Sequence, residues 1–250
     1  MSILLVDIGN TRVKWARLKS GRIGRQRAAA HAGWTSQDFA RRVLSASRGV
    51  ERIVAVSVAG ARVDKRFSAA ARRKLRVTPE FFVSKRRVGG ITTLYSEPWR
   101  LGADRLAAVI GAHHWARGRS VCVIDVGTAM TLDLVDASGR HLGGAIVPAP
   151  SLMTGSLLAE TSGIRRRARG GSSARSLFAR NTRAAIEQGA RYAAASVVDR
   201  AVSEARGVLG RAPLVLLTGG AAAEIQPLMR SASTAVPDLV LQGLAVVAGE

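Results

Sequence analysis

The sequence has a single cysteine, few aromatic residues and no long apolar run. Cys122 cannot form a disulfide within the chain or a zinc cage built from cysteines, so a reducing compartment, the cytoplasm, is expected. No apolar stretch reaches the roughly 18–20 residues that a membrane helix needs. The N-terminus meets an acid at Asp7 and so lacks the charged, then apolar layout of a signal peptide. These absences exclude disulfide-rich secreted and membrane-spanning classes.

Acidic residues are also scarce, because 17 Asp and Glu face 38 Lys and Arg, for a net charge of +21 and a pI near 11.8. Only five of the 38 are lysines, which leaves 33 arginines. Such a charge is typical of proteins that bind nucleic acid. However, the basic residues are spread along the chain, and aromatic side chains on which bases stack make up only 4% of it. We therefore interpret the charge as a solvated basic surface, and a nucleic-acid partner is not expected.

A short pattern occurs twice, about half a chain apart. V-D-I-G-N-T at Val6–Thr11 resembles I-D-V-G-T-A at Ile124–Ala129, and each copy joins an apolar strand to a strand of alternating polarity. With 250 residues the chain can form two small domains. The repeat predicts an α/β protein with two similar halves, residues 1–117 and 118–250. Helices are expected at 37–47, 64–75, 101–115 and 182–208, and further strands at 53–58, 81–83, 142–147 and 213–217.

Each repeated turn has the chemistry of a phosphate-binding loop. A glycine lets the backbone approach a ligand, and successive N–H groups can cradle phosphate oxygens. Asn10, Thr11 and Thr128 add side-chain donors, while Asp7 and Asp125 suit a metal ion or its waters. One such turn is more simply an ordinary hairpin turn whose Asp caps its own backbone. The occurrence of two favours phosphate binding, and the absence of G-x-x-x-x-G-K-[ST] argues against a P-loop enzyme.

Two further segments could carry function. Thr218-Gly219-Gly220 follows an apolar strand, where bare backbone could approach a planar ring, although a glycine-assisted helix entry explains it equally well. Asp104 lies at the start of an expected helix, where the helix dipole alone accounts for a carboxylate. An ionised Asp at that place could also orient and deprotonate an alcohol in a phosphoryl transfer.

Taken in order, these motifs resemble the type III pantothenate kinase family of the acetate/sugar kinase–Hsp70–actin superfamily. The resemblance runs nearly from end to end of the chain. The matching segments are D-I-G-N-T-R-V-K at Asp7–Lys14, Y-S-E-P-W-R-L-G-A-D-R at Tyr95–Arg105, D-V-G-T-A-M-T-L-D at Asp125–Asp133, G-G-A-I-V-P at Gly143–Pro148, N-T-R-A-A-I-E-Q-G at Asn181–Gly189, T-G-G at Thr218–Gly220 and L-V-L-Q-G-L at Leu239–Leu244. The resemblance implies two actin-like (ribonuclease H-like) domains, each a mixed sheet flanked by helices.

The resemblance also implies a function: ATP-dependent phosphorylation of pantothenate to phosphopantothenate, the first step of coenzyme A biosynthesis. Asp104 would be the general base, and Asp125 would help to hold a monovalent cation, K⁺ or NH₄⁺. Asp7 would hold Mg²⁺ through water. The pantothenate residues would be Tyr95, Gly102, Arg105 and Thr182, and the ATP residues would be Asp7, Gly9, Asn10, Thr11, Lys14, Thr128, Thr131, Gly219 and Gly220. The family is dimeric, so a homodimer is implied, and no membrane partner is.

Two departures from the family pattern stand out. Pro148 is followed by Ala149-Pro150 where the family usually has glycine, and Arg180 replaces a usual glycine two residues before Thr182. Two alternatives to a pantothenate kinase remain open. One is a non-catalytic or moonlighting transcriptional accessory protein that binds nucleic acid through the basic surface. The other is a different sugar or acid kinase of the superfamily, against which the Tyr95–Arg105 segment argues.

Overall fold

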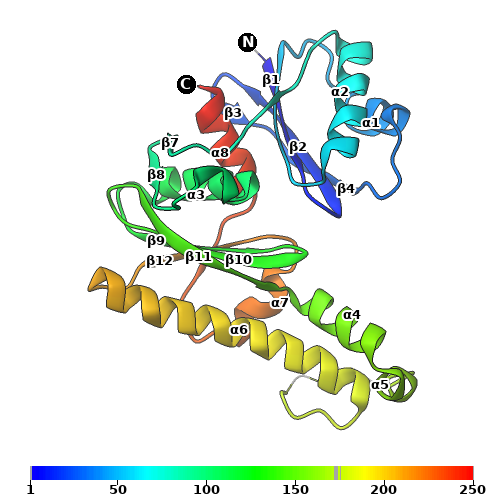
Figure 1. Ribbon diagram of the computed structural model, residues 1–250, viewed down its shortest axis with the longest axis vertical. Coiled ribbons are helices and arrows are strands. Elements are labelled where there is room, and N and C mark those ends of the chain that lie inside the picture. The colour runs from blue at the N-terminus through cyan, green and yellow to red at the C-terminus, as the bar shows by residue number, and fades with distance from the viewer. Residues whose placement is uncertain (1, 172–173, 175, 250) are drawn as a thin grey trace. The chain divides into compact units, whose positions relative to one another are not determined.

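The computed structural model describes residues 2–171, 174 and 176–249, and its backbone forms two compact units (Figure 1). Unit 1 comprises Met1–Gly118, Ala137–Gly143 and Asp238–Glu250. Unit 2 comprises Arg119–Asp136 and Gly144–Pro237. The chain thus first passes from unit 1 to unit 2 after Gly118, and two later segments of the chain belong to unit 1 again.

Unit 1 is built on a mixed sheet with the strand order β3-β2-β1-β5-β6. Its elements are β1 (Ser2–Ile8), β2 (Arg12–Lys19), β3 (Arg22–Ile23), β4 (Arg27–Ala30), α1 (Ser36–Arg42), β5 (Arg52–Ser57), α2 (Ala61–Leu75), β6 (Glu80–Phe81), β7 (Arg87–Val88), β8 (Ile91–Thr93), a 3₁₀ turn at Pro98–Arg100, α3 (Ala103–Ala116) and α8 (Leu239–Ala248). β1 is central, since it pairs antiparallel with β2 and parallel with β5, and every one of its residues is buried. β4 pairs with residues 12–15 of β2, whereas β3 pairs with Leu18 and Lys19 at the other end of that strand.

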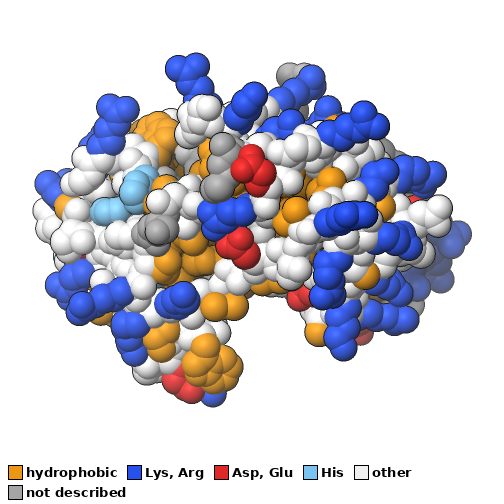
Figure 2. Space-filling view, turned by 90° about the horizontal axis from the view of Figure 1, so that it is seen from above, with side chains coloured by type: hydrophobic (Ala, Val, Ile, Leu, Met, Phe, Trp, Pro, Cys, Tyr) orange, Lys and Arg blue, Asp and Glu red, His pale blue; other side chains and the backbone are white. Residues whose placement is uncertain are grey.

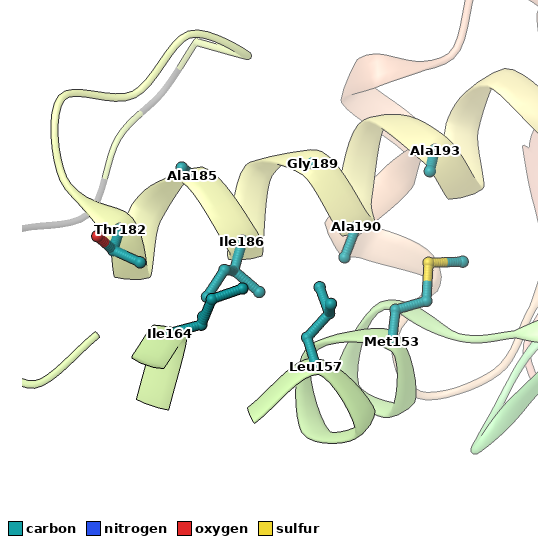
Figure 3. Close-up of a pocket in the computed structure, with 9 residues that line it drawn as sticks. All are labelled: Met153, Leu157, Ile164, Thr182, Ala185, Ile186, Gly189, Ala190 and Ala193. Carbon is teal, nitrogen blue, oxygen red and sulfur yellow. The ribbon is translucent and has the colours of Figure 1, made fainter. Parts of the chain in front are cut away.

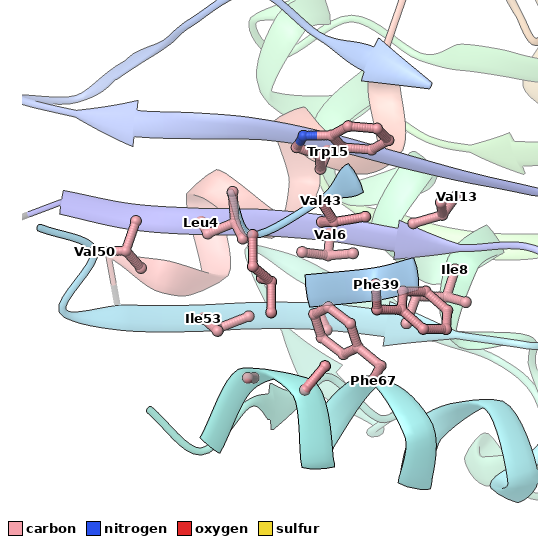
Figure 4. Close-up of a cluster of buried hydrophobic side chains, with 14 of the residues drawn as sticks. Leu4, Val6, Ile8, Val13, Trp15, Phe39, Val43, Val50, Ile53 and Phe67 are labelled. Atoms are coloured by element: carbon pink, nitrogen blue, oxygen red, sulfur yellow. The ribbon is translucent and has the colours of Figure 1, made fainter. Parts of the chain in front are cut away.

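One face of this sheet is covered by α1 and α2, and the core between them is apolar (Figure 4). Phe39 of α1 and Phe67 of α2 are fully buried, with their ring centroids 5.6 Å apart in an edge-to-face contact. The opposite face of α2 is strongly basic, since Arg62, Lys65, Arg72, Arg73 and Lys74 are all exposed. Lys and Arg side chains also cover much of the molecular face in Figure 2, with few acidic side chains among them.

Unit 2 repeats the same arrangement of strands. Its elements are β9 (Val121–Val126), β10 (Ala129–Val135), the greater part of β11 (Arg140–Pro148), α4 (Pro150–Glu160), α5 (Ser162–Arg167), α6 (Thr182–Leu209), β12 (Leu214–Thr218), α7 (Ala222–Ile225), a 3₁₀ turn at Gln226–Leu228 and β13 (Thr234–Ala235). The strand order is β11-β10-β9-β12-β13, in which β9 pairs antiparallel with β10 and parallel with β12. This is the order of unit 1, with β9 in the place of β1. The predicted α/β class with two mixed sheets is therefore confirmed.

The core of unit 2 lies between this sheet and the 28-residue helix α6. Ala194, Ala195 and Val198 of α6 are buried against strand residues that include Cys122 and Ile124. Burial, with the negative charge of Asp133 as a second cause, raises the pKa of the Cys122 thiol to about 12. Cys122 is thus a neutral core side chain, as its place in an apolar strand predicts.

Most of the expected elements are present, and three expectations need correction. The helix expected at 37–47 ends at Arg42, although Val43 and Leu44 are buried as their spacing indicates. The strand expected at 81–83 is only Glu80–Phe81. The strand β4 and the helices α4 and α5 were not expected, because their sequences show little apolar periodicity. In the described part of the chain, no helix is both long and apolar enough to cross a membrane.

The helices α3 and α8 of unit 1 cross where each has a glycine. A Cβ added to Gly243 would lie 1.8 Å from the backbone oxygen of Ala107, and one added to Gly111 would lie 2.3 Å from that of Leu239. The two backbones therefore touch, and only hydrogen atoms fit between them. This contact fixes the position of α3, whose first turn carries Asp104.

We predict that Gly243→Ala destabilises the protein by about 3 kcal/mol, because the added methyl group must push the two helix backbones apart. Urea unfolding followed by circular dichroism measures the change. Gly207→Ala on α6 is the matched control, since a Cβ there meets nothing within 4 Å. Alanine favours a helix over glycine by up to about 1 kcal/mol, so the control should lose no stability. Equal unfolding midpoints for the two variants would contradict the prediction.

Candidate active site

The first repeated turn joins β1 to β2 at the edge of the unit 1 sheet. Its closing bond runs from the Gly9 N–H to the Arg12 carbonyl oxygen, at 3.0 Å. Asn10 and Thr11, at its tip, are exposed. The antiparallel register places Lys14 opposite Asp7, and Lys14 Nζ lies 3.3 Å from Asp7 Oδ2. The structure thus brings together the five residues predicted for this phosphate loop.

Asp238 is a neighbour of this site that the sequence did not predict. It precedes α8 in the left-handed conformation, with φ 65°. Burial raises the pKa of the Asp238 carboxyl, and the positive charge of Lys14 acts in the opposite direction. Lys14 therefore faces acids from two ends of the chain. No local motif marks Asp238, because only the folding of α8 onto β1 brings it there.

The second repeated turn has the same design but is one residue shorter. The Gly127 N–H donates to the Ala129 carbonyl oxygen at 3.0 Å, one residue sooner than the equivalent bond in the first turn. Thr128 is exposed, and Thr131 lies opposite Asp125 in the β9–β10 register. Where the first copy places an ammonium group opposite its Asp, the second therefore places a hydroxyl.

Gly219 follows β12 and lies directly beside the second acid. Its φ is +95°, and a Cβ added there would be 2.5 Å from Asp125 Oδ1 and from the Val126 backbone N and O. Both the conformation and the space exclude a side chain. Gly220 is exposed next to it. The T-G-G segment is therefore bare backbone beside Asp125. Starting a helix, the alternative explanation from the sequence, does not by itself require this close approach.

The predicted base and three predicted substrate residues gather at the first turn of α3. Asp104 is partly exposed, and its Oδ1 accepts the Arg105 N–H at 2.8 Å. The Arg105 side chain is buried, and its Nη1 donates to the Tyr95 hydroxyl at 3.2 Å. Gly102 precedes the helix, and a Cβ there would lie 2.8 Å from Asp104 Oδ1. A carboxylate and a guanidinium thus share one helix N-terminus, where the helix dipole favours negative charge.

Two residues outside the sequence motifs hold Tyr95 in place. The Tyr95 ring stacks on the ring of fully buried His141, with centroids 5.7 Å apart. Arg86 donates to the Thr93, Tyr95 and Ser96 carbonyl oxygens, at 3.2, 2.6 and 2.8 Å. No spacing in the sequence links Arg86 or His141 to Tyr95, since the contacts arise from strand pairing between β7, β8 and the start of β11.

Thr182 is the first residue of α6. It lines a groove of about 440 Å³ between α4, α5 and α6 (Figure 3). The other lining residues are Met153, Leu157, Ile164, Ala185, Ile186, Gly189, Ala190 and Ala193. The groove is apolar apart from the Thr182 hydroxyl, so by itself it is a packing surface rather than a site for a charged ligand.

The two departures noted in the sequence have different outcomes. Ala149 is fully buried and Pro150 is the first residue of α4, a position where proline loses no hydrogen bond. The Ala149-Pro150 pair therefore starts a helix. Arg180 is exposed before the Asn181 cap of α6, and nothing in the structure explains it.

The strand order of the two units defines a class of fold, the actin-like, sugar-kinase fold. The fold is shared with a glucokinase of the ROK family from Streptomyces griseus, solved with glucose and AMPPNP (TM-score 0.53, 12% identity, 99% of this chain and 98% of that one). It is also shared with a Campylobacter jejuni protein described as a Baf family transcriptional activator (TM-score 0.59, 17% identity, 98% and 97%). At such identities the likeness concerns the fold alone.

Sequence relatives define the family more closely. The model of type III pantothenate kinase matches residues 3–204. A type III pantothenate kinase from Nitrosococcus oceani is 37% identical over 254 residues, which cover 98% of this chain and 93% of that protein. The chain belongs to the type III pantothenate kinase family. Membership supports ATP-dependent phosphorylation of pantothenate in coenzyme A synthesis, and no finding favours the nucleic-acid-binding alternative.

Proposed function

We propose that the chain transfers the terminal phosphoryl group of ATP to the primary hydroxyl of pantothenate, with Asp104 as the general base. The observation that carries this proposal is the grouping of Asp104, Arg105 and Tyr95 at the start of α3. A loose phosphoryl-transfer transition state needs mainly positioning and neutralisation of charge. Asp104 would orient the hydroxyl and accept its proton as the bond to phosphorus forms.

Arg105 and Tyr95 would hold the carboxylate of pantothenate. The Arg105 guanidinium is buried at 6% exposure and lies 5.9 Å from the centroid of the Tyr95 ring. Arginine is suited to a carboxylate because its planar fork can donate two parallel hydrogen bonds. Gly102 would leave room beside Asp104, and Thr182 would add a hydroxyl. Because Tyr95 is fixed by His141 and Arg86, this anchor is already ordered before substrate binds.

The turn at Gly9, Asn10 and Thr11 would bind ATP phosphates through N–H and hydroxyl groups, and Lys14 would add a positive charge. Thr128 and Thr131 would act likewise from unit 2, and Gly219 and Gly220 would face the adenosine. Asp7 would hold Mg²⁺ through water: its carboxylate is buried beneath the turn, with Lys14 Nζ 3.3 Å away, and Mg²⁺ prefers oxygen ligands and retains waters that can reach it. When bound, Mg²⁺ neutralises charge on the phosphates.

Asp125 would help to hold the monovalent cation, K⁺ or NH₄⁺. Its carboxylate lies beside the Val126 backbone at the point where Gly219 approaches closely. Carboxylate and carbonyl oxygens are the donors that such hard cations take. The reducing state expected for Cys122 and the biosynthetic family support a cytoplasmic location.

We predict that ADP release in a coupled assay requires pantothenate as well as ATP and Mg²⁺. The rate should be several-fold higher with K⁺ than with the same concentration of Na⁺, because a cation site at Asp125 would be selective for ion size. Equal rates in the two salts would remove the cation role of Asp125. No pantothenate-dependent turnover with saturating ATP, Mg²⁺ and K⁺ would overturn the proposed function itself.

Asp104→Asn should lower kcat about 10²–10⁴-fold, the contribution typical of a general base, because an amide cannot accept the proton. ATP affinity, measured by calorimetry, should be unchanged, since Asp104 is assigned to the alcohol and not to the nucleotide. The control is Glu204→Gln, which removes an exposed carboxylate that pairs with Arg200 on α6 and should leave kcat as it is. An Asp104→Asn enzyme with near-normal kcat would exclude Asp104 as the base.

We further propose a homodimer in which a second copy covers the apolar surface of unit 2. Leu157 lines the groove yet is 43% exposed, and Ile146 and Phe178 of the same unit are 61% and 89% exposed. Large apolar side chains left exposed on one unit, one of them in an apolar groove, favour an interaction surface there. Thr182 lines the same groove, so a partner there would lie next to a residue assigned to pantothenate.

Light scattering should therefore give a mass about twice the 26.3 kDa of the chain. Leu157→Arg should yield monomers, because it would bury a charge in an apolar interface. Val208→Arg is the control: Val208 is 68% exposed on α6 but does not line the groove, so this variant should remain dimeric. A monomeric wild-type protein at micromolar concentration, or a dimeric Leu157→Arg variant, would refute this interface.

A further inference from the structure

His31 contacts the first phosphate turn, although it lies outside every motif of the sequence. It follows β4, whose pairing with β2 places Ala30 opposite Arg12. The ladder continues by one residue, since the His31 N–H donates to the Thr11 carbonyl oxygen at 3.3 Å. The His31 ring lies on the turn as well, with Nε2 2.6 Å from the Gly9 carbonyl oxygen. A carbonyl oxygen only accepts, so Nε2 carries the proton of this bond.

The ring is held by the core of unit 1. His31 is 5% exposed, and its ring centroid lies 6.3 Å from those of both Trp34 and Phe39. The Trp34 N–H donates to the His31 carbonyl oxygen at 3.0 Å, which closes the backbone around the ring. Phe39 is itself fully buried among the side chains of Figure 4. The donor thus has a fixed direction, and the Gly9 carbonyl is fixed with it.

A pinned carbonyl also fixes the amide on the other side of the same peptide plane. The Gly9 C=O and the Asn10 N–H belong to one planar, trans peptide unit, in which they point in opposite directions. Because His31 is buried, the Gly9 carbonyl points toward the interior. The Asn10 N–H must then point outward, on the side where Asn10 and Thr11 are exposed. That is the direction in which an amide can donate to a phosphate oxygen.

We propose that His31 is a positioning residue for nucleotide binding, which orients the Asn10 amide toward the ATP phosphates by holding the Gly9 carbonyl. This inference rests on the proposed function, because that function places phosphates at this turn. Without the bond, the Gly9–Asn10 peptide can rotate, and the turn must be ordered again each time ATP binds. The free-energy cost of ordering the turn therefore weakens the binding of ATP and not that of pantothenate.

Two substitutions separate the hydrogen bond from the packing. His31→Phe keeps an aromatic ring but has no donor, so both the Kd and the KM for ATP should rise about tenfold, with the KM for pantothenate unchanged. His31→Gln keeps an amide that can take the place of Nε2, so it should return both constants to within about threefold of the wild type. Should His31→Phe fail to fold, His31→Met supplies a flexible apolar side chain without a donor.

Trp34→Phe is the matched control, because it disturbs the same aromatic cluster but leaves the bond between His31 and Gly9. Its melting temperature should fall, while its Kd for ATP should stay near the wild-type value. The inference is overturned if the donor-free variant binds ATP as the wild type does, or if His31→Gln does not restore the affinity for ATP. It is also overturned if Trp34→Phe raises the Kd for ATP as much as His31→Phe does.

Calorimetric titration with ATP and Mg²⁺, without pantothenate, keeps this test distinct from that of the proposed function. A protein that binds ATP but does not phosphorylate pantothenate would refute the function and still decide the role of His31. A wild-type protein that binds no ATP would refute both.

Discussion

The register of one antiparallel hairpin, used twice, is the constraint on which this structure depends. In each unit an Asp is the next-to-last residue of a buried strand, and the register across the turn that follows decides which side chain lies opposite that acid. A turn closed from Gly9 to Arg12 sets Lys14 against Asp7, and the shorter turn closed from Gly127 to Ala129 sets Thr131 against Asp125. Lys14 and Thr131 are each the third residue of their strand, so the two turns, although they differ in length, present the same strand position to the acid. The chemistry of the two copies therefore differs through the side chain at this one position, an ammonium group in the first and a hydroxyl in the second.

The sequence predicted the central elements because they carry strong local signals. β1 and β9 are apolar runs that end in an acid, and α3 and α6 are long and rich in alanine. The edge strand β4 carries no such signal, since R-A-A-A has neither β-branched residues nor alternation. For helix α1 the sequence predicts too much structure rather than too little. The apolar spacing that includes Val43 and Leu44 predicts their burial correctly, but both residues lie beyond the end of the helix.

The site divides in the same way. The D-x-G turns, Asp104 and the T-G-G segment could be found in the sequence because each is a local pattern with a chemical reason. Asp238, Arg86 and His141 could not, because each reaches the site through pairing between distant segments. The resemblance to a family suggests what each site residue does, whereas the structure shows which neighbours hold that residue in position. For Tyr95 this difference is plain: its motif gives its identity, and the stacked imidazole and the clamp of Arg86 give its position.

Helix α8 belongs to unit 1, although it follows the whole of unit 2 along the chain. During synthesis, the strands of unit 1 leave the ribosome first, and domains generally fold as they emerge. However, α3 has no partner for its glycine face until α8 appears, and the Arg52 guanidinium has no Ala248 carbonyl to bind. The helix that carries Asp104 is therefore completed last. A chain cut short before residue 238 would hold every segment of unit 2 but only part of unit 1, so translation order itself delays the moment at which α3 reaches its final place.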